Sequence, residues 1–167
     1  MNENSKKTAM LNGLIIGGLM SLKFLLGTST VGFISFLALV ISVSILVFMY
    51  RFAVAYRDNE NEGAISYRHA FGFLFQVYFY GSIVLSLIVL LYTTFINQAY
   101  LESMSNEMLK MYDRINFPVD DSFISVMEAM YKPAPFALLN LFSGVIVGSF
   151  WALILGAFIK KEKSIFE

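Results

Sequence analysis

The sequence predicts an all-α membrane protein in which four transmembrane helices are accompanied by an amphipathic helical hairpin between the third and the fourth. Of its 167 residues, 57% are hydrophobic, only 14% are charged and 17 are phenylalanine. Soluble domains carry about 25% charged residues. Four apolar runs each approach the roughly 20 residues that an α-helix needs to cross a bilayer. The lipid bilayer is therefore the first partner that the sequence predicts.

The first span is expected over residues 9–26. Lys6 and Lys7 precede this run, as basic residues precede the apolar part of a signal peptide. The run is long for that role and no small-x-small cleavage site follows it, so we interpret it as a retained helix. Roughly 18 residues at about 1.5 Å each give about 27 Å, close to the thickness of the hydrocarbon core.

Three further spans follow. The second, 31–50, has no charged residue, and the short turn before it makes the first two spans antiparallel neighbours. A polar hinge, which starts at Arg51 and ends at His69, separates it from the third span, 70–96. The fourth, 136–159, starts beside Pro135, which suits a first helical turn, and ends before a basic segment. We therefore expect one four-helix transmembrane domain over residues 1–167, with both termini on one side.

The basic residues set the expected orientation. The side that holds both termini and the hinge has eight lysines and arginines, whereas the connection between the third and fourth spans has three, against six acidic residues. Because basic loops stay in the cytoplasm, both termini are predicted to be cytoplasmic. The eight residues are Lys6, Lys7, Arg51, Arg57, Arg68, Lys160, Lys161 and Lys163.

The insert, residues 97–134, has the pattern of two amphipathic helices. Apolar residues recur at spacings of three and four from Leu101 to Ile115, which is the period of one helical face. Asn116 and Pro118 end that pattern, and Asp120 can cap a second helix. The sequence therefore predicts an extracytoplasmic helical hairpin.

Five of the nine methionines lie in this insert. Methionine side chains adapt to varied surfaces, so the stripe is a candidate surface for a protein partner. The alternative is that the stripes pack on each other or on lipid headgroups, and the sequence leaves both interpretations open. The candidate partner surface consists of Met104, Met108, Met111, Met127 and Met130.

Three local segments follow one another in a characteristic order. They are the hinge end from Gly63 to Phe71, the exit of the third span from Phe95 to Leu101 and the segment from Met130 to Pro133. On these residues the chain resembles the bacterial membrane family catalogued as domain of unknown function 4199, over nearly its full length. The resemblance implies a Bacteroidota-type bacterium and a multi-pass protein of the cytoplasmic (inner) membrane. It implies no activity, because the family brings no catalytic residue to transfer.

The hinge has the one spacing that is typical of a metal site. Asp58, Glu60 and Glu62 stand at positions one, three and five of an EF-hand-like loop. Position twelve is His69, where an EF-hand has a bidentate glutamate. We therefore interpret the segment as a solvated acidic turn in which Gly63 allows the reversal, and we expect no metal.

No catalytic or cofactor-binding site is expected, and the chain is predicted not to be an enzyme. The polar residues inside the predicted spans include no carboxylate, and the single histidine lies at a helix start, so a serine nucleophile would lack a base. The missing carboxylates also disfavour ion-coupled transport. A net charge of zero and the lack of a basic cluster disfavour nucleic-acid binding.

Small residues form a strip on the first span and another on the fourth. Such strips let helices approach closely in lipid, where dispersion and hydrogen bonds replace the hydrophobic driving force. We expect the two strips to face each other within one chain, with a homo-oligomer seam as the alternative. The strips are Gly13, Gly17 and Ser21 on the first span, and Asn140, Gly144, Gly148, Ala152 and Gly156 on the fourth.

Two functions stay open at this point. The one we adopt is a binding or accessory membrane subunit that presents its insert to a protein partner. The alternative is an oligomeric channel or transporter for a small solute, because four helices alone leave little room for a pore.

Overall fold

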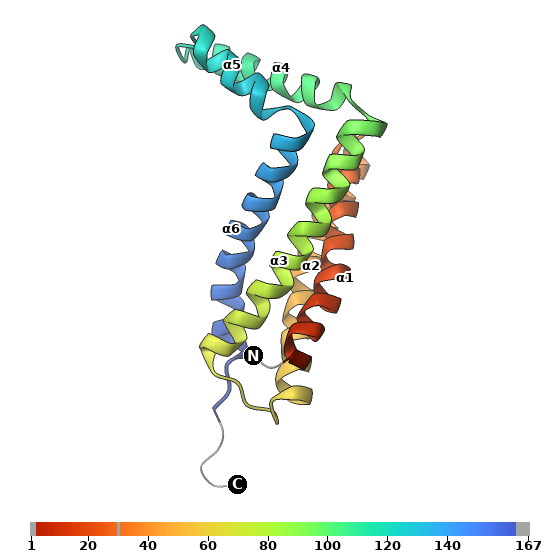
Figure 1. Cartoon of the computed structure of the whole chain (residues 1–167), viewed down its shortest axis with the longest axis vertical. Coiled ribbons are helices and arrows are strands. Elements are labelled where there is room, and N and C mark those ends of the chain that lie inside the picture. The colour runs from red at the N-terminus through yellow and green to blue at the C-terminus, as the bar shows by residue number, and fades with distance from the viewer. Residues whose placement is uncertain (1–2, 30, 163–167) are drawn as a thin grey trace. The chain divides into compact units, whose positions relative to one another are not determined.

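The computed structural model describes residues 3–29 and 31–162, and most of these residues are helical. Within them there is no β-strand, and an isolated β-bridge joins Ile65 to Lys161. The predicted all-α class is confirmed. Lys163, one of the basic residues used to predict the orientation, lies outside the described residues. The elements in chain order are α1 (Glu3–Gly27), α2 (Gly32–Glu60), α3 (Tyr67–Leu91), the π-helix η1 (Tyr92–Ile96), α4 (Ala99–Arg114), α5 (Asp121–Met130) and α6 (Pro133–Ile159) (Figure 1).

Four helical segments are long and apolar enough to cross a membrane, namely α1, α2, α3 with η1, and α6. These helices extend beyond the predicted membrane spans, most of all α2, which continues for ten residues past the end of the expected span at residue 50. Met49, Ala53 and Tyr56 explain this extension, because they are buried and follow one another at helical spacing. The helix therefore continues where the fully apolar run has already ended.

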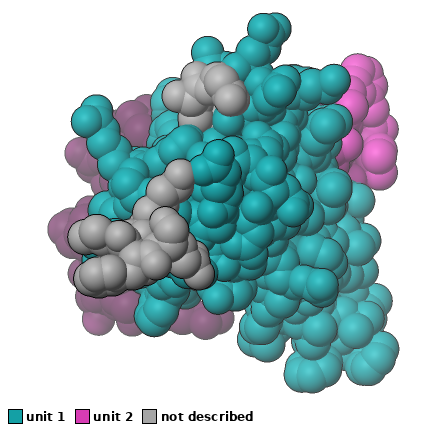
Figure 2. All heavy atoms as spheres, turned by 90° about the horizontal axis from the view of Figure 1, so that it is seen from below, with its two compact units in different colours: residues 1–85, 141–167 teal, residues 86–140 magenta. Residues whose placement is uncertain are grey.

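The described chain divides into two compact units (Figure 2). Unit 1 comprises residues 1–85 and 141–167, and unit 2 comprises residues 86–140. Unit 2 is larger than the predicted insert of 97–134, because it also holds the end of α3, the whole of η1 and the first turns of α6.

The core of unit 1 is built around α3. Phe73, Leu74 and Val77 of α3 are fully shielded from solvent, and they belong to one cluster with Ile16 of α1 and Met49 of α2. The spacing of three and four residues places these α3 side chains on one helical face. That face carries the contacts that join α1 and α2 to α3.

The small-residue strips of α1 and α6 both pack on α3, so the expectation that they face each other is wrong. A Cβ atom added to Gly17 of α1 would lie 2.9 Å from the carbonyl oxygen of Gly81 on α3. A Cβ atom added to Gly148 of α6 would collide with the ring of Tyr78, also on α3. A small residue allows the close approach of any neighbour. In this fold α3 is that neighbour for both helices.

The remaining strip members have separate positions. Ser21 and Ala152 are buried in unit 1. Asn140 belongs to unit 2 and donates its side-chain amide to the carbonyl oxygen of Phe136 in its own helix, at 2.9 Å. The Cβ positions of the other glycines meet residues of α3: Gly13 meets Tyr80, Gly144 meets Ser82, and Gly156 meets Tyr67.

In unit 2, α4 and α5 occupy the two segments that the pattern predicted to be helical. Asn116 leaves α4 with a φ of 51°, a left-handed conformation that asparagine tolerates. The carboxylate of Asp120 accepts the backbone N–H of Phe123 at 2.8 Å, which confirms the predicted cap of α5. The rings of Tyr112, Phe117 and Phe123 have centroids 5.1 to 6.0 Å apart and pack together at this turn.

Candidate functional site

Unit 2 contains a polar hollow of about 500 Å³ that η1, α4, α5 and the start of α6 line together. The apolar side chains of Leu101 and Leu109 and the ring of Pro133 also line it, and we name it the polar hollow for its charged residues alone. A volume of this size lies within the range of roughly 300–1,000 Å³ that holds small ligands. The polar and charged side chains that line this polar hollow include Gln98, Glu102, Asn106, Glu128, Tyr131 and Lys132.

The break between α3 and α4 shapes this hollow. η1 widens the last turn of the third apolar helix, and Asn97 ends it by donating its backbone N–H to the carbonyl oxygen of Tyr92 at 2.9 Å. Asn97 has a φ of −140°, outside the helical region, so the third helix does not run unbroken into α4. Tyr92 and Tyr100 then meet edge to face with ring centroids 6.0 Å apart. Burial raises the pKa of the Tyr100 phenol above its ordinary value.

The polar hollow carries charges of both signs. Glu102 on α4, Glu128 on α5 and Lys132 before α6 all line it. Among the residues that the structure describes, the ion pair that forms is Arg57 with Asp58, at 2.8 Å in unit 1. The two carboxylates and the ammonium of the polar hollow are therefore not ion-paired with one another.

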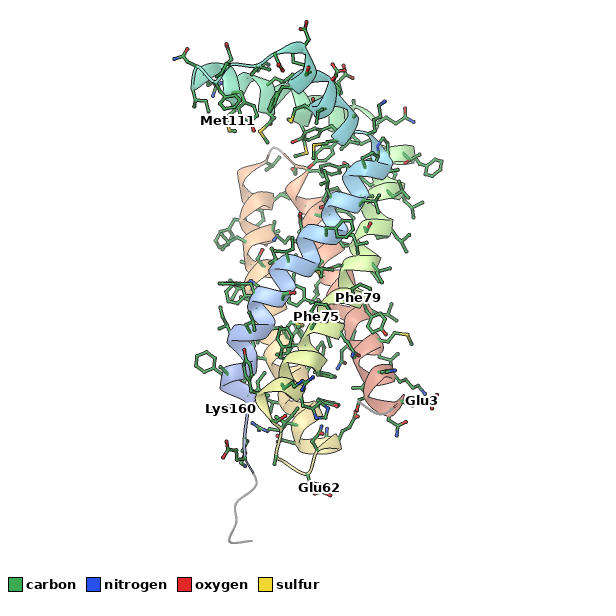
Figure 3. The ribbon with its side chains drawn as sticks, turned by 60° about the vertical axis from the view of Figure 1, so that its left-hand side comes forward. Glu3, Glu62, Phe75, Phe79, Met111 and Lys160 are labelled. Atoms are coloured by element: carbon green, nitrogen blue, oxygen red, sulfur yellow. The ribbon has the colours of Figure 1, made fainter. Side chains whose placement is uncertain are left out.

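A second hollow, of about 570 Å³, brings part of the predicted partner surface together. Three of the five methionines line it, and Met111, which Figure 3 labels on α4, is 48% exposed. The other two do not line it, because Met127 is buried and Met130 is exposed elsewhere. This methionine hollow is lined by Met104, Met108 and Met111 together with Glu107, Lys110, Arg114 and Tyr131.

A buried hydrogen-bond cluster lies at one end of unit 1. Tyr56 donates its hydroxyl to the Oγ atom of Ser5 at 2.8 Å, and its oxygen lies 2.9 Å from Nε2 of His69. Which group donates in this second bond depends on the tautomer of the imidazole. The Tyr56 ring stacks on Phe73 with centroids 4.0 Å apart. These contacts join the beginnings of α1 and α3 to the end of α2.

The hinge and the end of α6 lie at the same end of unit 1, where Figure 3 labels Glu3, Glu62 and Lys160. The β-bridge from Ile65 to Lys161 consists of two backbone hydrogen bonds of 2.8 and 3.0 Å.

The hinge carboxylates do not form a loop of the EF-hand kind. Asp58 and Glu60 lie in the last turn of α2, where Asp58 pairs with Arg57 and Glu60 accepts the hydroxyl of Thr8 at 2.6 Å. Glu62 follows with a φ of 52°, beside Gly63 with a φ of 77°. Within the described residues there is no group of three or more His, Cys, Asp or Glu side chains that could hold a metal ion. The structure thus separates the carboxylates that the spacing had placed in one loop.

Sequence reasoning did not identify the polar hollow. Its charged residues lie on different elements, and Glu102 is separated by the whole of the α4–α5 turn from Glu128 and Lys132. The sequence does place the charged residues Glu128 and Lys132 close to Tyr131, which lines both hollows. This proximity indicates a site only once the packing of α4 on α5 is known.

A family model with the description "Protein of unknown function (DUF4199)" matches residues 11–161 of the chain. The match covers α1 from residue 11 onward and all the helices from α2 to α6, including the insert. No curated protein and no solved structure matches the chain.

Proposed function

The chain belongs to the DUF4199 family, and we propose that it is an accessory subunit of the bacterial inner membrane that binds a protein partner through unit 2. The proposed role is non-enzymatic. In this proposal both termini lie in the cytoplasm and α4 with α5 lies outside it, which the distribution of lysine and arginine supports.

The observation that supports this proposal is the methionine hollow. Met104 and Met108 are half-buried and Met111 is exposed, so the flexible thioether side chains line a recess that is open to a ligand. Methionine-lined recesses accept amphipathic helices, because the unbranched side chains adjust to the apolar residues that enter. We assign the recess to such a helix of a partner protein.

The rim of the methionine hollow indicates the charge of that partner. Lys110 and Arg114 lie on the same α4 surface, one helical turn apart, and Glu107 is the acidic residue beside them. Two cations against one anion favour an incoming helix with acidic residues beside its apolar face. Exposed Ile115 and Val126 add apolar surface to unit 2, and they are 62% and 57% exposed.

Site-specific photocrosslinking in native membranes tests the proposal. A benzophenone amino acid at Met108 is expected to give one protein adduct of defined mass, whereas the same group at Ser103, which is exposed on α4 and lines neither hollow, is not. Met104→Glu should abolish the adduct by placing a carboxylate in the recess. Glu107→Lys should leave the adduct intact or strengthen it, because it adds a cation to a rim that is expected to meet acidic residues.

The result that would refute the proposal is specific. If position 108 crosslinks to lipid alone, the surface lies on the membrane and does not bind a partner. If it crosslinks only to a second copy of the chain, and the purified homo-oligomer passes a small solute in liposomes, the channel alternative replaces the accessory role.

A further inference from the structure

The polar hollow is a site of a different kind from the methionine hollow. Glu102 and Glu128 supply two carboxylates and Lys132 supplies an ammonium, and none of the three is engaged in an ion pair within the described part of unit 2. All three side chains are exposed, so water solvates their charges in the free chain and a ligand of complementary charge can reach them.

The charge pattern excludes the simplest ligands. A simple anion would meet two carboxylates, and a simple cation would meet the ammonium of Lys132. A ligand that carries an ammonium and an acidic group at separate ends satisfies both. Its ammonium would lie between Glu102 and Glu128, beside the ring of Tyr131, which can add a cation–π contact.

The position of the hollow in the chain points to the membrane interface. Thr93 and Thr94 at the end of the third apolar helix line it, as does Pro133 at the start of the fourth. The ends of membrane spans lie at the level of the lipid headgroups, where tyrosine is enriched. Tyr92 and Tyr100 follow this pattern at the same helix end.

We propose that the polar hollow binds a zwitterion with a primary ammonium at Glu102 and Glu128 and an acidic group at Lys132. Two sources have this chemistry. One is the phosphoethanolamine headgroup of a membrane lipid, and the other is a free zwitterion of similar size. The amides of Gln98 and Asn106 add donors and acceptors that can hold the part between the two charges.

Native mass spectrometry of the full chain in detergent tests the assignment. Phosphatidylethanolamine is expected to bind at one site at least about tenfold more tightly than phosphatidylglycerol, which lacks the ammonium. Glu102→Gln and Lys132→Met should each weaken binding by about tenfold or more. Glu107→Gln is the matched control, because it removes a carboxylate from the neighbouring hollow of the same helix and should change nothing.

The remaining outcomes distinguish a lipid from a free zwitterion and include those that would contradict the proposal. If free phosphoethanolamine competes with the lipid at equal concentration, the ligand is a free zwitterion. If it does not compete, the acyl chains contribute and the ligand is a lipid. Equal binding of both lipids, or unchanged binding in Glu102→Gln when that variant melts at the wild-type temperature, would overturn the assignment. These outcomes are independent of the test of the methionine hollow. Met104→Glu should abolish the partner adduct there, but it leaves every charged group of the polar hollow in place.

Discussion

Replacing Gly17 by alanine is expected to destabilise unit 1, whereas the same replacement at Gly18 is not. A Cβ atom on Gly17 would lie 2.6 Å from the Cβ atom of Val84 and 2.9 Å from the carbonyl oxygen of Gly81. A helix carbonyl cannot turn away as a flexible side chain does, so α1 and α3 would have to separate. A Cβ atom on Gly18 would meet nothing within 4 Å.

The two effects at Gly17 have opposite signs. Alanine gains about 1 kcal/mol over glycine in a helix interior. Overpacking a tight contact costs about 1–3 kcal/mol. The gain is common to both variants, so it cancels when they are compared. Gly17→Ala should therefore be less stable than Gly18→Ala by about 1–3 kcal/mol, and Gly18→Ala should equal or exceed the wild type.

Unfolding of the purified chain in mixed detergent micelles, followed by circular dichroism, measures this difference. The measurement should be repeated over a wide range of protein concentration, because a contact within one chain is independent of concentration. Equal stability of the two variants would refute the packing of α1 on α3. A difference that vanishes on dilution would move the Gly17 contact to an interface between copies.

Two further predictions concern the hydrogen-bond cluster and the orientation. Tyr56→Phe keeps the ring against Phe73 but removes the hydroxyl that joins Ser5 to His69. The free energy of unfolding should therefore fall by about 1–3 kcal/mol. The control is Tyr50→Phe at an exposed position, which should change the free energy of unfolding by less than about 0.5 kcal/mol. Because the chain has no native cysteine, Ser103→Cys should react with an impermeant maleimide in intact spheroplasts and Asn59→Cys only after lysis; the reverse pattern would contradict the proposed orientation.

The helices themselves were predictable because their signals are local. Long apolar runs predicted the four apolar helices, and the spacing of three and four residues predicted α4. The end of α2 lies beyond the end of the second predicted span. Arg51 ends the uncharged run, but Ala53 and Tyr56 continue the buried face, so the helix persists to Glu60. Hydropathy indicates where the membrane-spanning part of a helix ends. The length of the helix depends also on how the residues beyond that point pack.

The partner of each small-residue strip was not predictable. A strip such as Gly13 and Gly17 indicates that some helix approaches closely, but it has no information on which one. The small residues of α3 that contact these strips are Gly81 and Ser82. They are adjacent in the sequence and form no periodic strip. The polar hollow was missed for a related reason, since its charged residues come together only after the α4–α5 turn has formed.

The adjacency of Gly81 and Ser82 accounts for the central position of α3. Neighbouring residues on an α-helix point about 100° apart, so one small residue can serve α1 and the next can serve α6. A Cβ atom on Gly81 would lie 3.2 Å from Ile16, while Ser82 is fully buried against Gly144. The Ser82 hydroxyl donates to the carbonyl oxygen of Tyr78 at 2.8 Å, within its own helix. Its polar group is therefore satisfied without a partner from α6, and the contact depends on close packing alone. A single pair of small residues thus lets one helix bind two others in a solvent that provides no hydrophobic driving force between them.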